Sequence, residues 1–262
     1  MTPLFVHGVG VVGPGLTGWT ETAAVLTGAQ VWRDCDTLVP MPAILPKNER
    51  RRSSQAIRLA LEATHQAAVA AGLPATELAT VFGSSSGDGD VIHAILDSIS
   101  AHVPVSPTHF HNSVHNAPAG YWAIATRSHQ PSLSLAAYDA TAAATLFTAM
   151  GQARHGPVLM CVYDASLPAP LHAVRPVMPP FGAAIVLSSS PGDVPFGQLS
   201  VGLGSPDDVP SLPELRELRP VFAGNPAARL LPVLEALALR QRRRIVMSWT
   251  ATAPLVVDVT PC

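Results

Sequence analysis

The run GSSSG at residues 83–87 places Ser85 at the centre of a G-x-S-x-G pattern. The sequence predicts a buried strand before this run and a helix after it, which is the context in which a hydrolase presents a nucleophilic serine. Asp139 or Asp164, followed by His172, occur in the chain order that a relay of serine, acid and histidine needs. Ser85 is therefore one candidate nucleophile, and a serine hydrolase is one function that the sequence leaves open.

Four histidines lie between residues 101 and 116, and this clustering raises the question of a metal site. Before Pro107, no two of these histidines have the four-residue spacing that would place them on one face of a helix. The segment also contains no carboxylate or cysteine that could complete a set of metal ligands. The sequence therefore predicts no metal at these residues, which are His102, His109, His111 and His115.

The glycines near the N-terminus match the dinucleotide-binding pattern G-x-G-x-x-G at Gly8, Gly10 and Gly13. That motif requires a helix that opens at the third glycine, and Pro14 and Gly15 oppose such a helix. We therefore expect no nucleotide cofactor, and no other cofactor is indicated.

Residues 131–150 have the pattern of a strand that turns sharply into a helix. Serine or alanine alternates with leucine or alanine over residues 132–137, which is typical of a strand. Asp139 then stands where a helix N-cap belongs, before an alanine-rich run of high helix propensity. Such a corner directs one side chain and several backbone N–H groups into a shared cavity, so that Asp139 is the second candidate site residue.

The segment SLAAYDATA resembles the nucleophile elbow of the β-ketoacyl synthases, which belong to the thiolase-like superfamily. The elbow of that family reads like S-x-A-x-A-C-x-S-G, so that Asp139 takes the place of the cysteine. Other segments resemble the same family in the same order, over about residues 4–188; they include LFVHGVGVVGPG, RRRSSQAIRLALEATHQAAVAAGL, the GSSSG turn and VLMCVYDA. A further family segment, S-P-x-x-x-x-N-x-x-x-N-x-x-A-G, is matched at Ser106, Pro107, Asn112, Asn116, Ala119 and Gly120, where Asn116 is expected to cap a helix.

The resemblance implies an α/β, thiolase-like fold reduced to a single half, with a mixed five-stranded sheet and helices on its faces. Residues 1–189 would form this half, which is like the N-terminal half of a ketoacyl synthase. Residues 190–262 would form a short extension of a helix and strands, packed on the same domain in place of the second half. Within the extension, the Pro/Gly-rich stretch 190–213 is expected to be a linker or an irregular edge.

The second half of a ketoacyl synthase supplies two histidines and a lysine, and this chain has no counterpart of them. Its last histidine is His172, and its only lysine is Lys47. A carboxylate such as Asp139 is also a poor nucleophile that would give an unstable anhydride. The resemblance therefore implies a non-catalytic subunit with no catalytic residue, in which Asp139 serves as a helix N-cap.

Subunits that have lost the elbow cysteine act in that family as chain length factors. The resemblance implies that this chain pairs with an active ketoacyl synthase, as a heterodimer or heterotetramer, and meets acyl carrier protein through the complex. The implied pathway is type II polyketide-like synthesis of an aryl polyene or xanthomonadin pigment. The alternative that remains open is a homodimer that only binds acyl carrier protein.

Two groups of residues carry this expectation. The expected subunit interface consists of the strand residues Ser132, Leu133, Ser134, Leu135, Ala136 and Ala137, together with Asn116. The residues expected to close the partner's acyl tunnel and set product length by their bulk are Ile95, Ile99, Phe110 and Tyr121.

The composition is that of one large globular domain. The chain has 262 residues, of which 48% are hydrophobic and 13% charged, and its net charge is −2. With this charge, we expect no electrostatic attraction of the protein to nucleic acid or to an acidic membrane surface. The three distant cysteines, Cys35, Cys161 and Cys262, indicate no disulfide and fit a cytoplasmic location. We expect neither a signal peptide nor a membrane-spanning segment.

Overall fold

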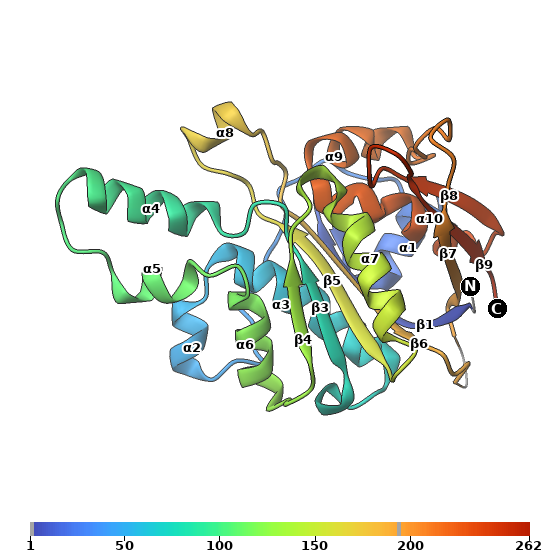
Figure 1. Cartoon of the computed structure of the whole chain (residues 1–262), viewed down its shortest axis with the longest axis horizontal. Coiled ribbons are helices and arrows are strands. Elements are labelled where there is room, and N and C mark those ends of the chain that lie inside the picture. The colour runs from blue at the N-terminus through green and yellow to red at the C-terminus, as the bar shows by residue number, and fades with distance from the viewer. Residues whose placement is uncertain (1–2, 193–194) are drawn as a thin grey trace.

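The computed structural model describes residues 3–192 and 195–262. One mixed sheet of nine strands runs through the molecule, in the order β4-β3-β5-β6-β1-β7-β9-β8, with the short β2 paired to β1 (Figure 1). The strands are β1 (Leu4–Gly13), β2 (Leu16–Thr17), β3 (Ala79–Gly83), β4 (Ser132–Leu135), β5 (Val158–Asp164), β6 (Phe181–Ser188), β7 (Gly197–Leu203), β8 (Arg243–Met247) and β9 (Leu255–Thr260).

The first five strands of this order form the expected mixed sheet. Strand β3 pairs in parallel with both β4 and β5, whereas β6 pairs antiparallel with β5 and β1. The fold is thus α/β, with a mixed sheet, as expected.

The C-terminal strands extend this sheet. Strand β7 pairs antiparallel with β1, β9 pairs with β7, and β8 pairs with β9. The prediction of a linker or an irregular edge over 190–213 was therefore wrong for β7. Glycines and prolines flank β7 and concealed its alternation, in which Leu199 and Val201 are buried.

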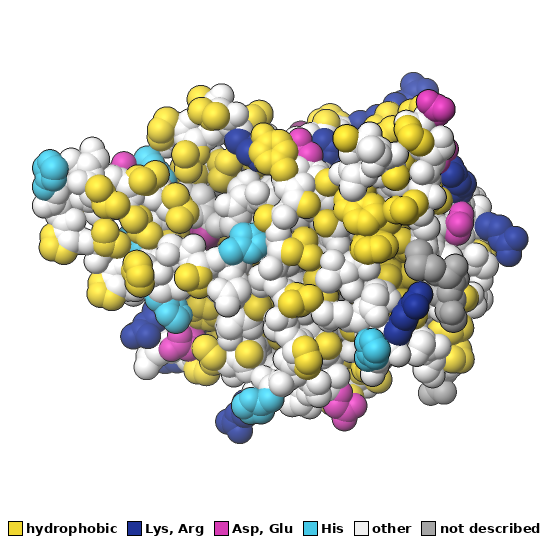
Figure 2. Space-filling view, viewed as in Figure 1, with side chains coloured by type: hydrophobic (Ala, Val, Ile, Leu, Met, Phe, Trp, Pro, Cys, Tyr) yellow, Lys and Arg dark blue, Asp and Glu magenta, His cyan; other side chains and the backbone are white. Residues whose placement is uncertain are grey.

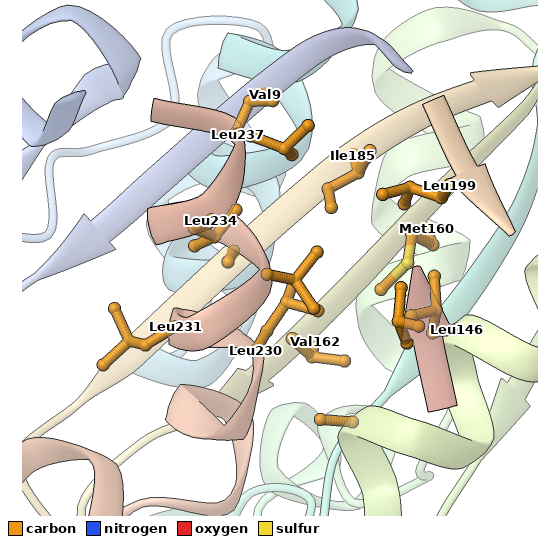
Figure 3. Close-up of a cluster of buried hydrophobic side chains, with 14 of the residues drawn as sticks. Val9, Leu146, Met160, Val162, Ile185, Leu199, Leu230, Leu231, Leu234 and Leu237 are labelled. Carbon is orange, nitrogen blue, oxygen red and sulfur yellow. The ribbon is translucent and has the colours of Figure 1, made fainter. Parts of the chain in front are cut away.

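Helices cover the two faces of the sheet, and each face has its own hydrophobic cluster. Helices α3 (Gln55–Ala71) and α6 (Ala117–Thr126) cover one face, and α1 (Gly18–Leu26), α7 (Thr141–Gln152) and α10 (Leu231–Ala238) cover the other. Successive residues of β5 alternate between the clusters, because side chains of a strand point to opposite faces. Figure 3 shows the cluster on the face that α1, α7 and α10 cover. Leu146 of α7 and Leu234 and Leu237 of α10 lie there with residues of β1, β5 and β6.

Helix α3 explains the glycines of β1. Its N-terminus is capped by Ser54, whose Oγ accepts a hydrogen bond from the Ile57 N–H at 3.3 Å, and Gly72 ends it in the left-handed conformation. A Cβ atom at Gly8 or Gly10 would collide with backbone atoms of α3. These glycines therefore permit the close approach of helix and strand, which accounts for the pattern that resembles a dinucleotide motif.

The remaining helices lie outside these two layers. Helices α4 (Gly89–Ser100) and α5 (Pro107–Asn112) form an arm that projects from the body of the molecule, and α8 (Leu171–Val174) lies in a loop nearby (Figure 1). Helices α2 (Lys47–Arg52) and α9 (Arg219–Gly224) are short surface elements. In the described part of the chain, no helix has the length and apolar character to cross a membrane.

Candidate functional site

The chain turns from strand to helix at the corner that the sequence singles out. Strand β4 ends at Leu135, a single 3-10 turn spans Tyr138–Ala140, and α7 begins at Thr141. The Thr141 hydroxyl accepts a hydrogen bond from the Ala137 N–H at 3.0 Å and donates one to the Tyr138 carbonyl at 2.7 Å. Tyr138 has a φ of 53°, in the left-handed region that side-chain-bearing residues rarely adopt. The corner is therefore a tight, strained bend held by Thr141.

The Asp139 side chain forms an ion pair at this bend. Its Oδ1 accepts a hydrogen bond from Nη2 of Arg175 at 2.9 Å, and the carboxylate is 57% exposed. The Arg175 guanidinium also lies 3.4 Å above the centre of the Tyr138 ring. Arg175 thereby fixes the loop that carries α8 against the corner.

The prediction that Asp139 is a helix N-cap was wrong. The N-cap position of α7 belongs to Ala140, and no side chain makes a capping hydrogen bond there. The 3-10 turn delays the start of the helix, so that Asp139 lies one residue too early to reach the N–H groups of the first helical turn. Its charge is balanced by Arg175 instead.

Residues of the C-terminal segment, between 210 and 248, face the corner across a cavity. A cavity of about 270 Å³ lies between them, lined by Asp139, Ala143, Pro210, Ser211, Leu212, Phe222, Arg229, Val246, Met247 and Ser248. Arg229 is half-buried, and its guanidinium lies 4.5 Å above the Phe222 ring. Sequence reasoning missed Arg175 and Arg229, because nothing in the sequence links either residue to position 139.

The chemistry open to this corner is limited. Among the described residues, the only side chain that hydrogen-bonds the Asp139 carboxylate is Arg175, and no imidazole lines the cavity. Condensation on an acyl thioester needs a thiolate nucleophile and donors for the developing oxyanion. The corner offers an ion-paired carboxylate, and the adjacent cavity offers the guanidinium group of Arg229.

Ser85 does not form the relay that a serine hydrolase needs. Its Oγ donates to Oδ1 of Asp164 at 3.0 Å, and its N–H donates to the same oxygen at 2.8 Å. The Ser84 hydroxyl also donates to this oxygen, and His115 Nε2 lies 3.0 Å from the Ser84 carbonyl oxygen. Within residues 3–192 and 195–262, no histidine is hydrogen-bonded to Ser85, so that its proton has no imidazole to accept it.

The Asp164 carboxylate accepts the hydrogen bonds that hold the GSSSG turn. It is fully buried, and this burial raises the pKa of its carboxyl to about 6, against the hydrogen bonds from Ser84 and Ser85, which favour the charged form. Asp164 closes β5, next to the end of β3. Its role is therefore to anchor the loop that leads from the sheet to the α4–α5 arm.

The histidine cluster is not assembled as a metal site. Over the described ranges, no group of three or more histidine, cysteine, aspartate or glutamate side chains is placed to hold a metal ion. His109 and His111 lie in α5 of the arm, whereas His115 contacts the Ser84 carbonyl in the body.

Strand β4 is an open edge of the sheet. It pairs with β3, and in the part of the chain that the structure describes it pairs with no strand on its other side. The Ser132 hydroxyl accepts a hydrogen bond from Thr80 at 2.7 Å, and Leu133 is 44% exposed. Ser132, Leu133 and Ala136 are exposed, and Ser134, Leu135 and Ala137 are half-buried.

Apolar side chains stand exposed on the elements around this edge. Figure 2 shows them spread over the arm and the centre of the same face. The exposed ones include Ile92, Leu96 and Ile99 of α4, Phe110 of α5, Ile124 of α6, Leu133 of β4 and Phe147 of α7. Groups of exposed apolar side chains are typical of surfaces that bind other molecules.

The residues expected at the interface and tunnel lie at different depths. Ile99 and Phe110 are exposed and Ile95 is half-buried, but Tyr121 is 1% exposed and donates its hydroxyl proton to Asn112 Oδ1 at 3.0 Å. Asn116 occupies the N-cap position of α6 without a capping hydrogen bond from its side chain, which contradicts the expected cap.

Comparison with known proteins identifies the family. The model of the β-ketoacyl synthase N-terminal domain matches residues 19–216. No curated protein matches the chain.

The fold recurs in solved structures of ketosynthase complexes. "Ketosynthase (ApeO) in Complex with its Chain Length Factor (ApeC)" from Xenorhabdus doucetiae has a chain with 21% identity and a TM-score of 0.74, and the match covers 99% of this chain and 100% of that one. "The ishigamide ketosynthase/chain length factor" has 15% identity, a TM-score of 0.71, and coverage of 100% and 99%. A complex of AntDE with the acyl carrier protein AntF has 11% identity, a TM-score of 0.77, and coverage of 100% and 99%. With its strand-to-helix corner and its matched family domain, the chain belongs to the β-ketoacyl synthase N-terminal domain family.

Proposed function

We propose that the chain is a catalytically inactive ketoacyl synthase homologue that acts as a chain length factor. It pairs with an active ketoacyl synthase and shapes the acyl tunnel of that enzyme in type II polyketide-like synthesis of a polyene pigment. The observation that carries this proposal is the corner itself. Asp139 takes the place of the cysteine in the elbow pattern that the segment resembles, and it is ion-paired to Arg175. Among the described residues, no histidine lines the cavity beside it.

The matched structures support the pairing. Two of them are described as a ketosynthase together with its chain length factor, and a third contains a ketosynthase with an acyl carrier protein. In each of the three, nearly the whole of this chain corresponds to nearly the whole of one chain. By analogy, the partner of this chain is a ketosynthase, and the acyl carrier protein reaches the complex through that partner.

The open edge of β4 supports a specific mode of pairing. An unpaired edge strand presents N–H and C=O groups that can continue the sheet into a second subunit. The exposed apolar side chains of α4, α5 and α6 lie on the face that holds this edge. We assign the interface to Ser132, Leu133, Ser134, Leu135, Ala136, Ala137 and Asn116.

The arm supplies the groups that would set product length. The side chains proposed to enter the partner's tunnel are Ile95 and Ile99 on α4 and Phe110 on α5, of which Ile99 and Phe110 are exposed. Tyr121 is proposed to contribute by positioning α5, because its hydroxyl donates a hydrogen bond to Asn112 at the end of that helix.

Co-purification with a ketosynthase encoded beside this chain tests the pairing. The wild-type chain should co-purify with the synthase at equal stoichiometry. Leu133→Asp should reduce the co-purified synthase at least tenfold, because it places a charge at the centre of the interface. Leu203→Asp, at an exposed leucine of β7, is the matched control and should leave pairing unchanged. Equal pairing by both variants would contradict the assigned interface, and a homodimer that excludes the synthase would favour the alternative.

A further inference from the structure

The cavity beside the corner contains a positive charge that the proposed function does not use. Arg229 lines this cavity of about 270 Å³ together with Asp139. The Arg229 Nη2 group donates to the Ala223 carbonyl at 3.2 Å, and its guanidinium stacks on Phe222. No carboxylate of residues 3–192 or 195–262 lies within 4.0 Å of Arg229.

The charged residues that line the cavity are Asp139 and Arg229, and they are not in direct contact with each other. Asp139 is close enough to raise the pKa of Arg229, but burial, the larger effect, lowers it. The Asp139 carboxylate is already engaged by Arg175 at 2.9 Å. The Asp139 carboxylate is therefore paired with Arg175, and Arg229 has no direct carboxylate partner among the described residues. A half-desolvated guanidinium without a carboxylate partner is a costly arrangement that a bound anion relieves.

The rest of the cavity wall is mostly apolar. The side chains of Ala143, Leu212, Phe222, Val246 and Met247 form much of it, and Ser211 and Ser248 add two hydroxyl-bearing residues. At about 30 Å³ for each water-sized group, the cavity has room for roughly nine such groups. A small inorganic anion would leave most of this space and its apolar wall unfilled.

We propose that the cavity binds an unbranched monocarboxylate of about six carbons in all. The carboxylate pairs with Arg229, whose planar guanidinium matches it with two parallel hydrogen bonds. The tail lies along the apolar wall that Leu212, Phe222 and Met247 provide. This site is built by the C-terminal segment and does not depend on pairing with a synthase.

Calorimetric titration of the purified full chain tests this proposal. Hexanoate should bind with a measurable affinity, and hexan-1-ol, which has the tail without the charge, should bind at least tenfold more weakly. Arg229→Gln should weaken hexanoate binding at least tenfold. Arg154→Gln, which removes an exposed arginine at the end of α7, is the matched control and should bind hexanoate as the wild type does.

A length series on the unaltered chain gives a second test, since Arg229→Gln also removes the stacking on Phe222. Affinity should rise from acetate to hexanoate and fall again for dodecanoate, which exceeds the cavity. Failure of hexanoate to bind, equal binding of hexanoate and hexan-1-ol, or undiminished binding by Arg229→Gln would each overturn the proposal.

Discussion

At the scale of single residues, the feature of this corner on which the proposal rests is the ion pair between Asp139 and Arg175. Arg175 is largely shielded, with 18% of its side chain exposed, and it contacts both Asp139 and the Tyr138 ring. The pair is partly exposed to water, so that its contribution to stability is small, on the order of 0–1 kcal/mol. Its effect is positional, because it holds the α8 loop against the bend.

Asp164 gives a pH-dependent prediction at the same scale. Burial raises its pKa to about 6 in the folded chain, above the unfolded value near 3.9. The folded state therefore binds more protons between these values, and the contribution of Asp164 to stability is largest below pH 4 and is lost as the pH rises through 6.

Asp164→Asn removes this titration. The free energy of unfolding of the wild type, relative to that of the variant, should fall by on the order of 2–3 kcal/mol between pH 4 and pH 7. Urea unfolding of both proteins at the two pH values measures this difference. A parallel pH dependence of the two proteins would show that Asp164 does not titrate in this range.

At the scale of elements, the packing of β1 against α3 depends on glycine. A Cβ atom at Gly10 would collide with the Ala63 carbonyl and crowd the Gln66 side chain. Gly10→Ala should therefore lower the free energy of unfolding by about 1–3 kcal/mol, because the helix must move away from the sheet.

Gly202→Ala in β7 is the matched control for this substitution. A Cβ atom there meets no other atom within 4 Å, so that the variant should be as stable as the wild type. Chemical denaturation of both variants measures the comparison. Equal stability of the two would contradict the role assigned to the glycines of β1.

Local signals decided how much of the fold could be predicted. The bounds of α3 follow from the Ser54 cap and the Gly72 stop, which act within a few residues of each end. The elbow, too, could be located, because alternation in β4 and alanine content in α7 are both local. Strand β7 could not be located from the sequence, because its strand structure depends on its pairing with β1 and β9.

The candidate site could be predicted in part, for a related reason. Position 139 was identified by its place in a sequence pattern. Its ion-pair partner Arg175 lies 36 residues further along the chain, and Arg229, which lines the same cavity, lies 90 residues further; both approach it only through the tertiary fold. The 3-10 turn that displaces the helix start was likewise invisible, because its cause is the bend around Thr141.

At the scale of the whole molecule, the C-terminal segment completes the half-domain. Leu230, Leu234 and Leu237 share one hydrophobic cluster with Leu146 of α7, and the last strands continue the sheet from β1. The segment thus covers a surface of the sheet and closes the cavity beside the corner. At the other end of the sheet, among the described residues, β4 pairs with no strand on its outer side.

Shortening a side chain of the arm should alter the product of the paired synthase. Phe110 is 73% exposed on α5, so that Phe110→Ala should leave the stability of the isolated chain within about 0.5 kcal/mol of the wild type. In the complex, the variant should give longer or mixed polyene chains at an unchanged rate of malonyl consumption. Mass spectrometry of the products measures the length, and Val209→Ala, at an exposed valine outside the arm, is the control.

The most direct test of the account is an elongation assay with the purified chain, the partner synthase and both together, supplied with acyl and malonyl carrier proteins. The account predicts that this chain alone consumes no malonyl substrate, and that the two together make polyene products of defined length. Elongation by this chain alone would contradict the claim that a carboxylate bound to Arg175 has replaced the catalytic nucleophile.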